Sequence, residues 1–579
     1  MHRYISPSTA RVATLAAALV AGLAVTACST TRDTPVAQED LAAPGRESKL
    51  VTPPAPPAPM MHAPQAMARS IVANVSHRYR PPVAPPANTE NYADFDDNPV
   101  HRTSDQPVST FSIDVDTGSY TNVRRMLVDG VRPPADAVRA EEFINYFDHD
   151  HPAPTSRDVP FRVSTELAPA PWNAERHLLM IGIKGYDVPR SDLPPANLVL
   201  LVDTSGSMQS ADKLPLLKRA MAMLVRQLRP QDTVSIVVYA GSAGLVLPPT
   251  TGDRQGEILA ALGQLQAGGS TNGGAGIQLA YDMARQGYVD GGVNRILLAT
   301  DGDFNVGTVD QGALETLIAD QRASGIALTT LGFGSGNYND ALAERLADLG
   351  NGNHAYIDSA LEARRVLVEA MGSTLLTIAS DVKIQVEFNP AVVAEYRLVG
   401  YENRLLRNED FANDKVDAGE IGAGHEVTAL YEITPVGSGA MQLPPLRYGA
   451  KRAAATNSSE VAHLRLRYKQ PGTDQSRLIE TPILRSALRP RASDSLRFTA
   501  AVAGFADALR GGTRTDNWGW DGILAAARPT GRNRLDARRA EFIELVEQAR
   551  LLVNRNDEGN DDPNDDPSDA RDAGALVSE

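Results

Sequence analysis

The stretch Leu198–Ser207, with the sequence LVLLVDTSGS, decides the fold of this chain. It is a run of apolar residues that ends at Asp203, and the hydroxyl residues Ser205 and Ser207 follow. A continuous apolar run bounded by turn residues predicts a strand that is buried on both faces of a parallel sheet. In open α/β sheets, ligands bind just beyond the carboxyl ends of the strands. One carboxylate and two hydroxyls at that position, all oxygen donors, predict a site for a hard cation such as Mg²⁺.

A second apolar run, Asn294–Asp303, reads NRILLATDGD and contains Asp301. Between the two runs, the glycine-rich segment Gly268–Gly276 places Thr271 ahead of a helix. The regular alternation of strands and helices predicts a doubly wound parallel sheet with right-handed crossovers. In the strand order 3-2-1-4-5-6, strands 1 and 4 are neighbours where the winding reverses. We therefore expect Asp203, at the end of strand 1, to lie beside Asp301, at the end of strand 4, with room for one ion.

These motifs resemble the metal-ion-dependent adhesion site of von Willebrand factor type A (VWA) domains. The resemblance covers about residues 195–378 and matches all positions of the family motif by residue type: Asp203, Ser205, Ser207, Thr271 and Asp301. In such family members, the serines hold Mg²⁺ directly, and the Thr or Asp holds it directly or through water. Few carboxylates surround the ion, which leaves it electrophilic and leaves one coordination position open. The resemblance therefore implies Mg²⁺ as the cofactor, with Mn²⁺ and Ca²⁺ as alternatives, and a protein partner that offers a Glu or Asp carboxylate.

Asp303 follows the motif directly. We expect it either to hydrogen-bond to a metal ligand from just outside the coordination shell or to serve only as a turn residue.

Length and charge limit what the chain can be. Its 579 residues are too many for a single hydrophobic core, so we expect several domains. The formal net charge of −15 argues against nucleic acid as a partner and against electrostatic attachment to anionic lipid. Cys28 is the single cysteine, so the chain can form neither an intramolecular disulfide nor a cysteine-based metal site.

Residues 1–28 have the pattern of a secretory signal peptide. Arg3 and Arg11 give a basic start, an apolar stretch follows, and small residues precede Cys28. A transmembrane helix is the alternative, but the apolar stretch is short for a bilayer span and the cysteine would be unexplained. The last four of these residues resemble a bacterial lipobox, which implies that Cys28 is lipidated. Ser29, in place of an Asp, suggests sorting to the outer membrane, so we expect a lipid-anchored protein of the cell envelope that faces the periplasm.

The strand and helix patterns predict a multidomain α/β plus β protein in which a doubly wound α/β domain is inserted in a β-sandwich, with a helical domain after it. The resemblance implies that the inserted Rossmann-like domain is a VWA domain. Two independent β units are the rival arrangement. The expected segments are a signal peptide (1–28), a proline-rich disordered tether (29–108), an N-terminal α+β module (109–158), a β-sandwich (159–190 with 379–490), the VWA domain (195–378), a C-terminal helical domain (491–555) and an acidic disordered tail (556–579). The N-terminal and C-terminal modules resemble those that accompany VWA domains in a group of bacterial lipoproteins.

Two further acidic groups allow more than one interpretation. Asp114 and Asp116 follow an expected strand, and we interpret them as a capped turn, with a second cation site as the alternative. The acidic tail is interpreted as solvated and disordered, with calcium binding as the alternative.

We expect a binding protein and no enzyme, because the sequence lacks G-x-S-x-G, H-E-x-x-H and G-x-x-x-x-G-K-[ST]. The alternative function is a metal-dependent periplasmic hydrolase, in which the same ion activates water. That chemistry needs a general base, and Asp303 and Asp212 are the candidates that the sequence offers.

Overall fold

The computed structural model describes residues 88–269, 273–302, 311–322, 324–445, 459–515, 518–529 and 536–559. The expected signal peptide with Cys28, most of the expected tether, Thr271 and Asp303 lie outside the described residues. Within the described part of the chain, no helix is both long enough and apolar enough to cross a membrane.

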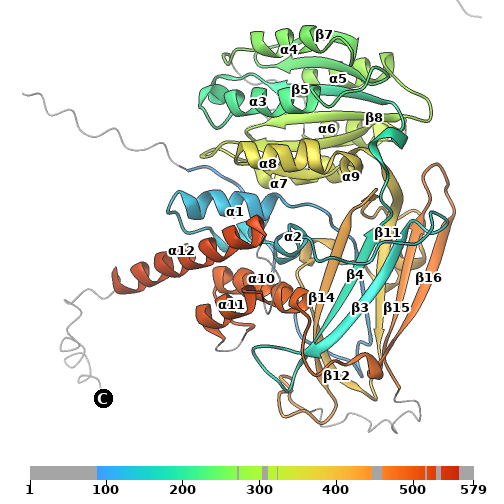
Figure 1. Cartoon of the computed structure of the whole chain (residues 1–579), viewed down its shortest axis with the longest axis vertical. Coiled ribbons are helices and arrows are strands. Elements are labelled where there is room, and N and C mark those ends of the chain that lie inside the picture. The colour runs from blue at the N-terminus through green and yellow to red at the C-terminus, as the bar shows by residue number, and fades with distance from the viewer. Residues whose placement is uncertain are drawn as a thin grey trace, which may run out of the picture. The chain divides into compact units, whose positions relative to one another are not determined.

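The segment expected to be a VWA domain, called the VWA domain below, is built on a mixed sheet with the strand order β10-β9-β8-β5-β6-β7. Figure 1 labels three strands of this sheet, β7, β5 and β8. Its strands are β5 (Ala196–Asp203), β6 (Thr233–Tyr239), β7 (Ala243–Thr251), β8 (Val293–Thr300), β9 (Ala327–Phe333) and β10 (His354–Ile357). Its helices are α3 (Leu214–Val225), α4 (Gln255–Gln264), α5 (Gly273–Gln286), α6 (Gln311–Arg322), α7 (Asp340–Leu349), α8 (Ala360–Arg364) and α9 (Met371–Leu375). The central strand β5 runs parallel to both β6 and β8, so the winding reverses where the sequence predicts it.

The residues of β5 alternate between two hydrophobic cores, one on each face of the sheet. Leu198, Leu200 and Val202 pack in a core with α3, α4 and α8. Val199 and Leu201 pack in the other core, with α5, α6 and α7. All of these side chains are fully buried, which explains why the strand reads as an unbroken apolar run.

The strand β7 corrects the expectation of a wholly parallel sheet. It pairs antiparallel with β6 at the edge of the sheet, and the pairing shifts register twice. Pro248 and Pro249 lie within β7. Proline has no backbone N–H to donate, and an edge strand tolerates it because that side has no second strand to receive the hydrogen bond. The two prolines interrupt the apolar pattern, so the sequence did not predict this strand.

The remaining strands form a β-sandwich of two antiparallel sheets. One sheet has the order β1-β12-β14-β4-β3, and the other has the order β13-β11-β15-β16, with β2 paired to β11. These strands are β1 (His101–Arg102), β2 (Val108–Ser112), β3 (Phe161–Pro169), β4 (His177–Gly185), β11 (Thr377–Phe388), β12 (Val393–Val399), β13 (Ile421–Gly422), β14 (Glu426–Pro435), β15 (Glu460–Lys469) and β16 (Ser476–Leu484). Because β4 precedes the VWA domain and pairs with β14, which follows it, the VWA domain is inserted in a single sandwich.

The helices outside the VWA domain share one hydrophobic core. They are α1 (Gly118–Val128), α2 (Ala140–Asn145), α10 (Asp494–Arg510), α11 (Gly519–Ala527) and α12 (Ala537–Gly559). In this core, Tyr120 and Phe143 from the N-terminal helices pack with Phe498, Phe505 and Phe542 from the C-terminal helices. The two ends of the described chain, treated as separate modules in the sequence analysis, are therefore packed together.

Two expected boundaries need correction. The tether was expected to reach residue 108, but β1 pairs with β12, and residues 89–91 are hydrogen-bonded to the VWA domain. The acidic tail was expected from residue 556, but α12 continues to Gly559. Composition suggested disorder in both places. It records neither the hydrogen bonds of residues 89–102 to distant segments nor the continuation of a helix into a polar stretch.

Candidate metal site

The first element of the site is the loop that follows β5. Asp203 is the last residue of this strand, and its side chain is fully buried. Its Oδ1 accepts a hydrogen bond from the backbone N–H of Ser205 at 2.8 Å, which fixes the turn. The hydroxyl oxygens of Ser205 and Ser207 lie 2.9 Å apart. This local geometry places one carboxylate and two hydroxyls at the carboxyl end of the central strand.

The second element is Asp301, which directly follows β8 and is also fully buried. In the parallel pair of β5 and β8, Val202 lies opposite Ala299, so both strands end at the same edge of the sheet. Neighbouring strands are about 4.8 Å apart. Burial raises the pKa of Asp203 to about 6, and the negative charge of Asp301 adds to this rise. The two carboxylates therefore lie within electrostatic reach of each other.

The loop that leads to Thr271 is described as far as Gly269. The backbone N–H of Gly268 donates to the carbonyl of Thr204 at 2.8 Å, and that of Gly206 donates to the carbonyl of Gly269 at 3.0 Å. These bonds hold the described part of the loop against the loop after β5. The positions of Thr271 and Asp303 themselves lie outside the described residues, so their roles remain predictions.

Gly302 has a specific reason to be glycine. Its φ is +88°, and a Cβ atom there would lie 2.1 Å from the backbone nitrogen of Asn339. The loop before α7 therefore passes directly over the turn that carries Asp301. Asn337, in this loop, donates from Nδ2 to Oδ2 of Asp301 at 3.1 Å.

Lys213 is a residue of this site that the sequence analysis missed. Its Nζ lies 3.0 Å from Oδ2 of Asp301 and donates to Oδ1 of Asn337 at 2.7 Å. Lys213 occupies the N-cap position of α3, where a positive charge opposes the helix dipole. The sequence offered one signal for the role of Lys213. A lysine at a helix N-terminus indicates that a nearby carboxylate compensates its charge.

The described residues fit a divalent cation. Oδ2 of Asp203 is buried and has no hydrogen-bond partner among the described residues. A buried carboxylate oxygen without a partner is costly, and a bound cation would satisfy it. The donor set of carboxylate and hydroxyl oxygens is the type that Mg²⁺ prefers.

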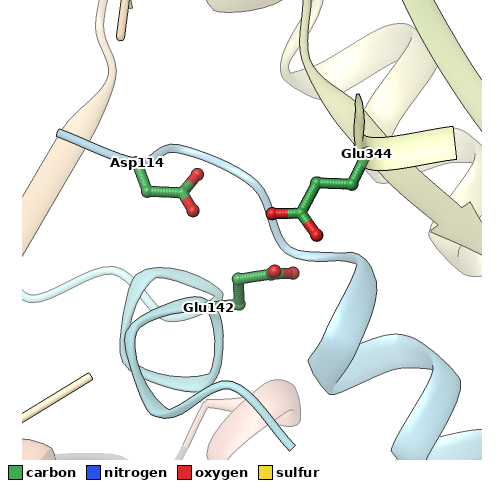
Figure 2. A group of neighbouring side chains, drawn as sticks. All are labelled: Asp114, Glu142 and Glu344. Carbon is green, nitrogen blue, oxygen red and sulfur yellow. The ribbon is translucent and has the colours of Figure 1, made fainter. Parts of the chain in front are cut away.

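A separate acidic cluster lies where α2, α7 and the segment after β2 meet. Figure 2 shows Asp114, Glu142 and Glu344 with their carboxylates turned toward one another, and oxygens of the three lie within 4.8 Å of each other. Asp116, the partner of Asp114 in the sequence analysis, is buried beside them. Burial, and then the charge of Asp114, raises the pKa of Asp116 well above its ordinary range.

Two arginines already supply positive charge to this cluster. Arg404 donates to Asp114 at 3.1 Å and to Glu344 at 3.2 Å, and Arg139 forms an ion pair with Glu142. Oδ1 of Asp114 also accepts from the backbone N–H of Asp116 at 2.8 Å, which is the geometry of a capped turn. The contacts agree with the interpretation of Asp114 and Asp116 as a turn, and the cluster works as an ionic junction between the VWA domain, the sandwich and the N-terminal helices.

Comparison with known families agrees with this architecture. A family model described as von Willebrand factor type A domain matches residues 198–303, and one described as von Willebrand factor matches residues 86–180. A third, described as the C-terminal part of uncharacterized protein YfbK, matches residues 373–552, which hold the later sandwich strands and the C-terminal helices. The resemblance to VWA domains and the predicted fold class are thereby confirmed.

Similar proteins occur in bacteria. Protein YfbK of Escherichia coli K12 is 47% identical over 490 residues, which cover 83% of this chain and 84% of that protein. Protein sll0103 of Synechocystis is 26% identical over 322 residues, which cover 55% of this chain and 71% of that protein. Among solved structures, a von Willebrand factor type A protein from Catenulispora acidiphila is 15% identical, with a TM-score of 0.38, and the match covers 66% of this chain and 88% of that one.

Proposed function

Because the chain belongs to the family of VWA domain proteins that includes YfbK, we propose that it is a lipid-anchored envelope protein whose VWA domain binds a protein partner through a divalent cation. One observation carries the proposal: Asp203, Ser205, Ser207 and Asp301 stand at the carboxyl ends of two adjacent strands, and the buried Oδ2 of Asp203 has no partner among the described residues.

The chemistry of these residues supports partner binding. The serine hydroxyls carry no charge, so the described donors offer only the two carboxylates Asp203 and Asp301 to a dication, with Lys213 beside them. A divalent ion held there would supply an electrophilic centre that one more anionic oxygen completes. A Glu or Asp side chain of a partner protein offers that oxygen. Ser205 and Ser207 would orient the site, because the turn after β5 fixes both hydroxyls together.

Metal binding is the first step to test. The full chain, purified in detergent and stripped with EDTA, should bind Mg²⁺ or Mn²⁺ in isothermal titration calorimetry. Asp203→Ala should abolish this binding. Asp290→Ala is a matched control, because Asp290 is exposed and precedes β8 at the opposite end of the strand. If wild type and Asp203→Ala take up metal equally, the site is not the one proposed.

Partner binding is the second step. The chain would be crosslinked in envelope extracts and recovered with its partners, with and without EDTA. We expect one set of partners that disappears with EDTA and in Asp203→Ala but persists in Asp290→Ala. Recovery of identical partners in all four samples would remove the metal from the binding mechanism.

The membrane anchor is tested separately. The proposal rests on the sequence of residues 1–28, with Cys28 as the lipidated residue. Cys28→Ala should move the chain from the membrane fraction to the soluble fraction and abolish incorporation of labelled palmitate. Membrane retention of Cys28→Ala without label would contradict the lipid anchor.

A further inference from the structure

Lys213 brings a positive charge to the carboxylate that a metal ion would use. Its ammonium group forms an ion pair with Asp301, and its side chain is 8% exposed. Asn337 closes the arrangement, because it accepts from Lys213 and donates to Asp301. Among the described residues, both hydrogen-bond partners of the ammonium group therefore belong to the metal site or to the loop that covers it.

The structure also makes room for this lysine. Gly334 has a φ of +76°, and a Cβ atom there would lie 2.3 Å from the Cγ and Cε atoms of Lys213. The hydroxyl of Tyr356 donates to the carbonyl of Gly334 at 2.5 Å, which holds this backbone in place. The aliphatic part of Lys213 thus lies in a slot bounded by backbone, and its position is set by packing as well as by charge.

We propose that Lys213 competes with the divalent cation for Asp301. The ammonium group of Lys213 must leave Asp301 before the ion can bind fully. This inference rests on the metal site of the proposed function and adds a residue that sets its affinity. In the chain without metal, the lysine neutralises one of the two neighbouring carboxylates. When an ion arrives, the ammonium and the ion repel each other over one shared carboxylate.

The consequence is a metal site of lower affinity. When the ammonium group and the divalent ion share one carboxylate, their repulsion lowers the affinity for the metal about tenfold, even when water screens both charges strongly. The site would then fill only above a threshold of metal concentration, and the release of Lys213 from Asp301 and Asn337 would accompany filling. A lysine at this place also leaves the filled site more positive by one charge than the same site without it, which favours an anionic partner.

The first test compares metal affinities. Lys213→Met keeps the aliphatic stem and removes the charge. Lys218→Met is the matched control, because Lys218 lies on the same helix and its ammonium donates to the carbonyls of Gly263 and Leu265. In the EDTA-stripped full chain, Lys213→Met should bind Mn²⁺ about tenfold more tightly than wild type, and Lys218→Met should match wild type. Equal affinity in Lys213→Met and wild type overturns the inference and leaves the proposed function standing. No Mn²⁺ binding by any of the chains overturns both.

The second test needs no substitution. Limited acetylation followed by mass spectrometry reports how accessible each lysine is in the wild-type chain. Addition of Mn²⁺ should raise acetylation of Lys213 several-fold relative to Lys218, because the ion displaces its ammonium group from Asp301. Unchanged labelling of Lys213 on a chain that binds Mn²⁺ by calorimetry overturns the displacement.

Discussion

Glu90 and Gly336 lie 246 residues apart in the sequence, and Oε1 of Glu90 accepts a hydrogen bond from the backbone N–H of Gly336 at 2.8 Å. The backbone of Thr89 donates to the carbonyl of Gly336 at 2.8 Å, and that of Asn91 donates to the carbonyl of Tyr338 at 2.9 Å. The segment that follows the proline-rich region is therefore laid along the loop before α7. Because this loop also carries Asn337, the segment borders the candidate metal site.

Glu90→Ala should loosen this loop. The side chain of Glu90 is nearly buried and also pairs with Arg125 at 2.9 Å, so its removal leaves a partly buried arginine without its carboxylate. We expect a loss of about 2 kcal/mol in unfolding free energy. Hydrogen exchange followed by mass spectrometry should show faster exchange in residues 336–340. The exposed Asp94 is the control, and Asp94→Ala should leave the exchange rates unchanged. If residues 336–340 exchange as slowly in Glu90→Ala as in wild type, the loop does not depend on this contact.

Arg404 should be a large contributor to stability at the ionic junction. It contacts Asp114 at 3.1 Å, Glu344 at 3.2 Å and Asp348 at 2.6 Å, and its side chain is 13% exposed. Removal of one partner from a buried ionic group leaves uncompensated charge, so Arg404→Met should cost about 3–5 kcal/mol in urea denaturation followed by circular dichroism. Arg407→Met, three residues later, removes an arginine whose side chain is 74% exposed and should cause no measurable change. A loss of less than about 1 kcal/mol in Arg404→Met would mean that the carboxylates neutralise themselves by protonation.

Stability should fall as the pH falls below neutral, and buried histidines are one cause. Burial lowers the pKa of His149 to about 4 and that of His151 to about 4, from an ordinary value of 6.5. Between these values the unfolded chain binds protons that the folded chain does not, so stability present above pH 6.5 is lost as the pH falls toward 4. The difference corresponds to about 3 kcal/mol for a fully buried histidine.

The pH effect can be separated from other titrating groups by substitution. His149→Gln removes the titration, so its unfolding free energy should depend less on pH between 7 and 4 than that of wild type. Parallel slopes for wild type and His149→Gln would contradict a neutral buried His149.

The sequence predicted the elements whose signal is local. The apolar run of β5 is long, unbroken and buried on both faces, so Asp203 could be placed at the end of a central strand. The topology then placed Asp301 beside it, because the neighbours of the first strand follow from the winding rule. In contrast, the edge strand β7 carries two prolines and gave no strand signal.

The features that the sequence analysis missed depend on contacts between distant segments. Lys213 meets Asn337 across 124 residues, and Glu90 meets Gly336 across 246 residues. No local pattern records such pairs. The shared core of α1 and α2 with α10, α11 and α12 was missed for the same reason, since each helix shows only its own apolar face.

The ion pair between Lys213 and Asp301 should show strong coupling in the absence of metal. In EDTA, Asp301→Asn leaves the ammonium of Lys213 buried without its carboxylate, and Lys213→Met leaves Asp301 without its cation. Each single change should destabilise the chain, while the double variant removes both charges and so restores part of the loss. We expect a coupling energy of about 1–3 kcal/mol from the double-mutant cycle, measured by urea denaturation. The exposed pair of Arg550 and Asp521, 2.7 Å apart, should give less than about 0.5 kcal/mol in the same cycle. If the buried pair couples no more strongly than the exposed one, the charge of Lys213 is already balanced by solvent, and its competition with a metal ion would lose its physical basis.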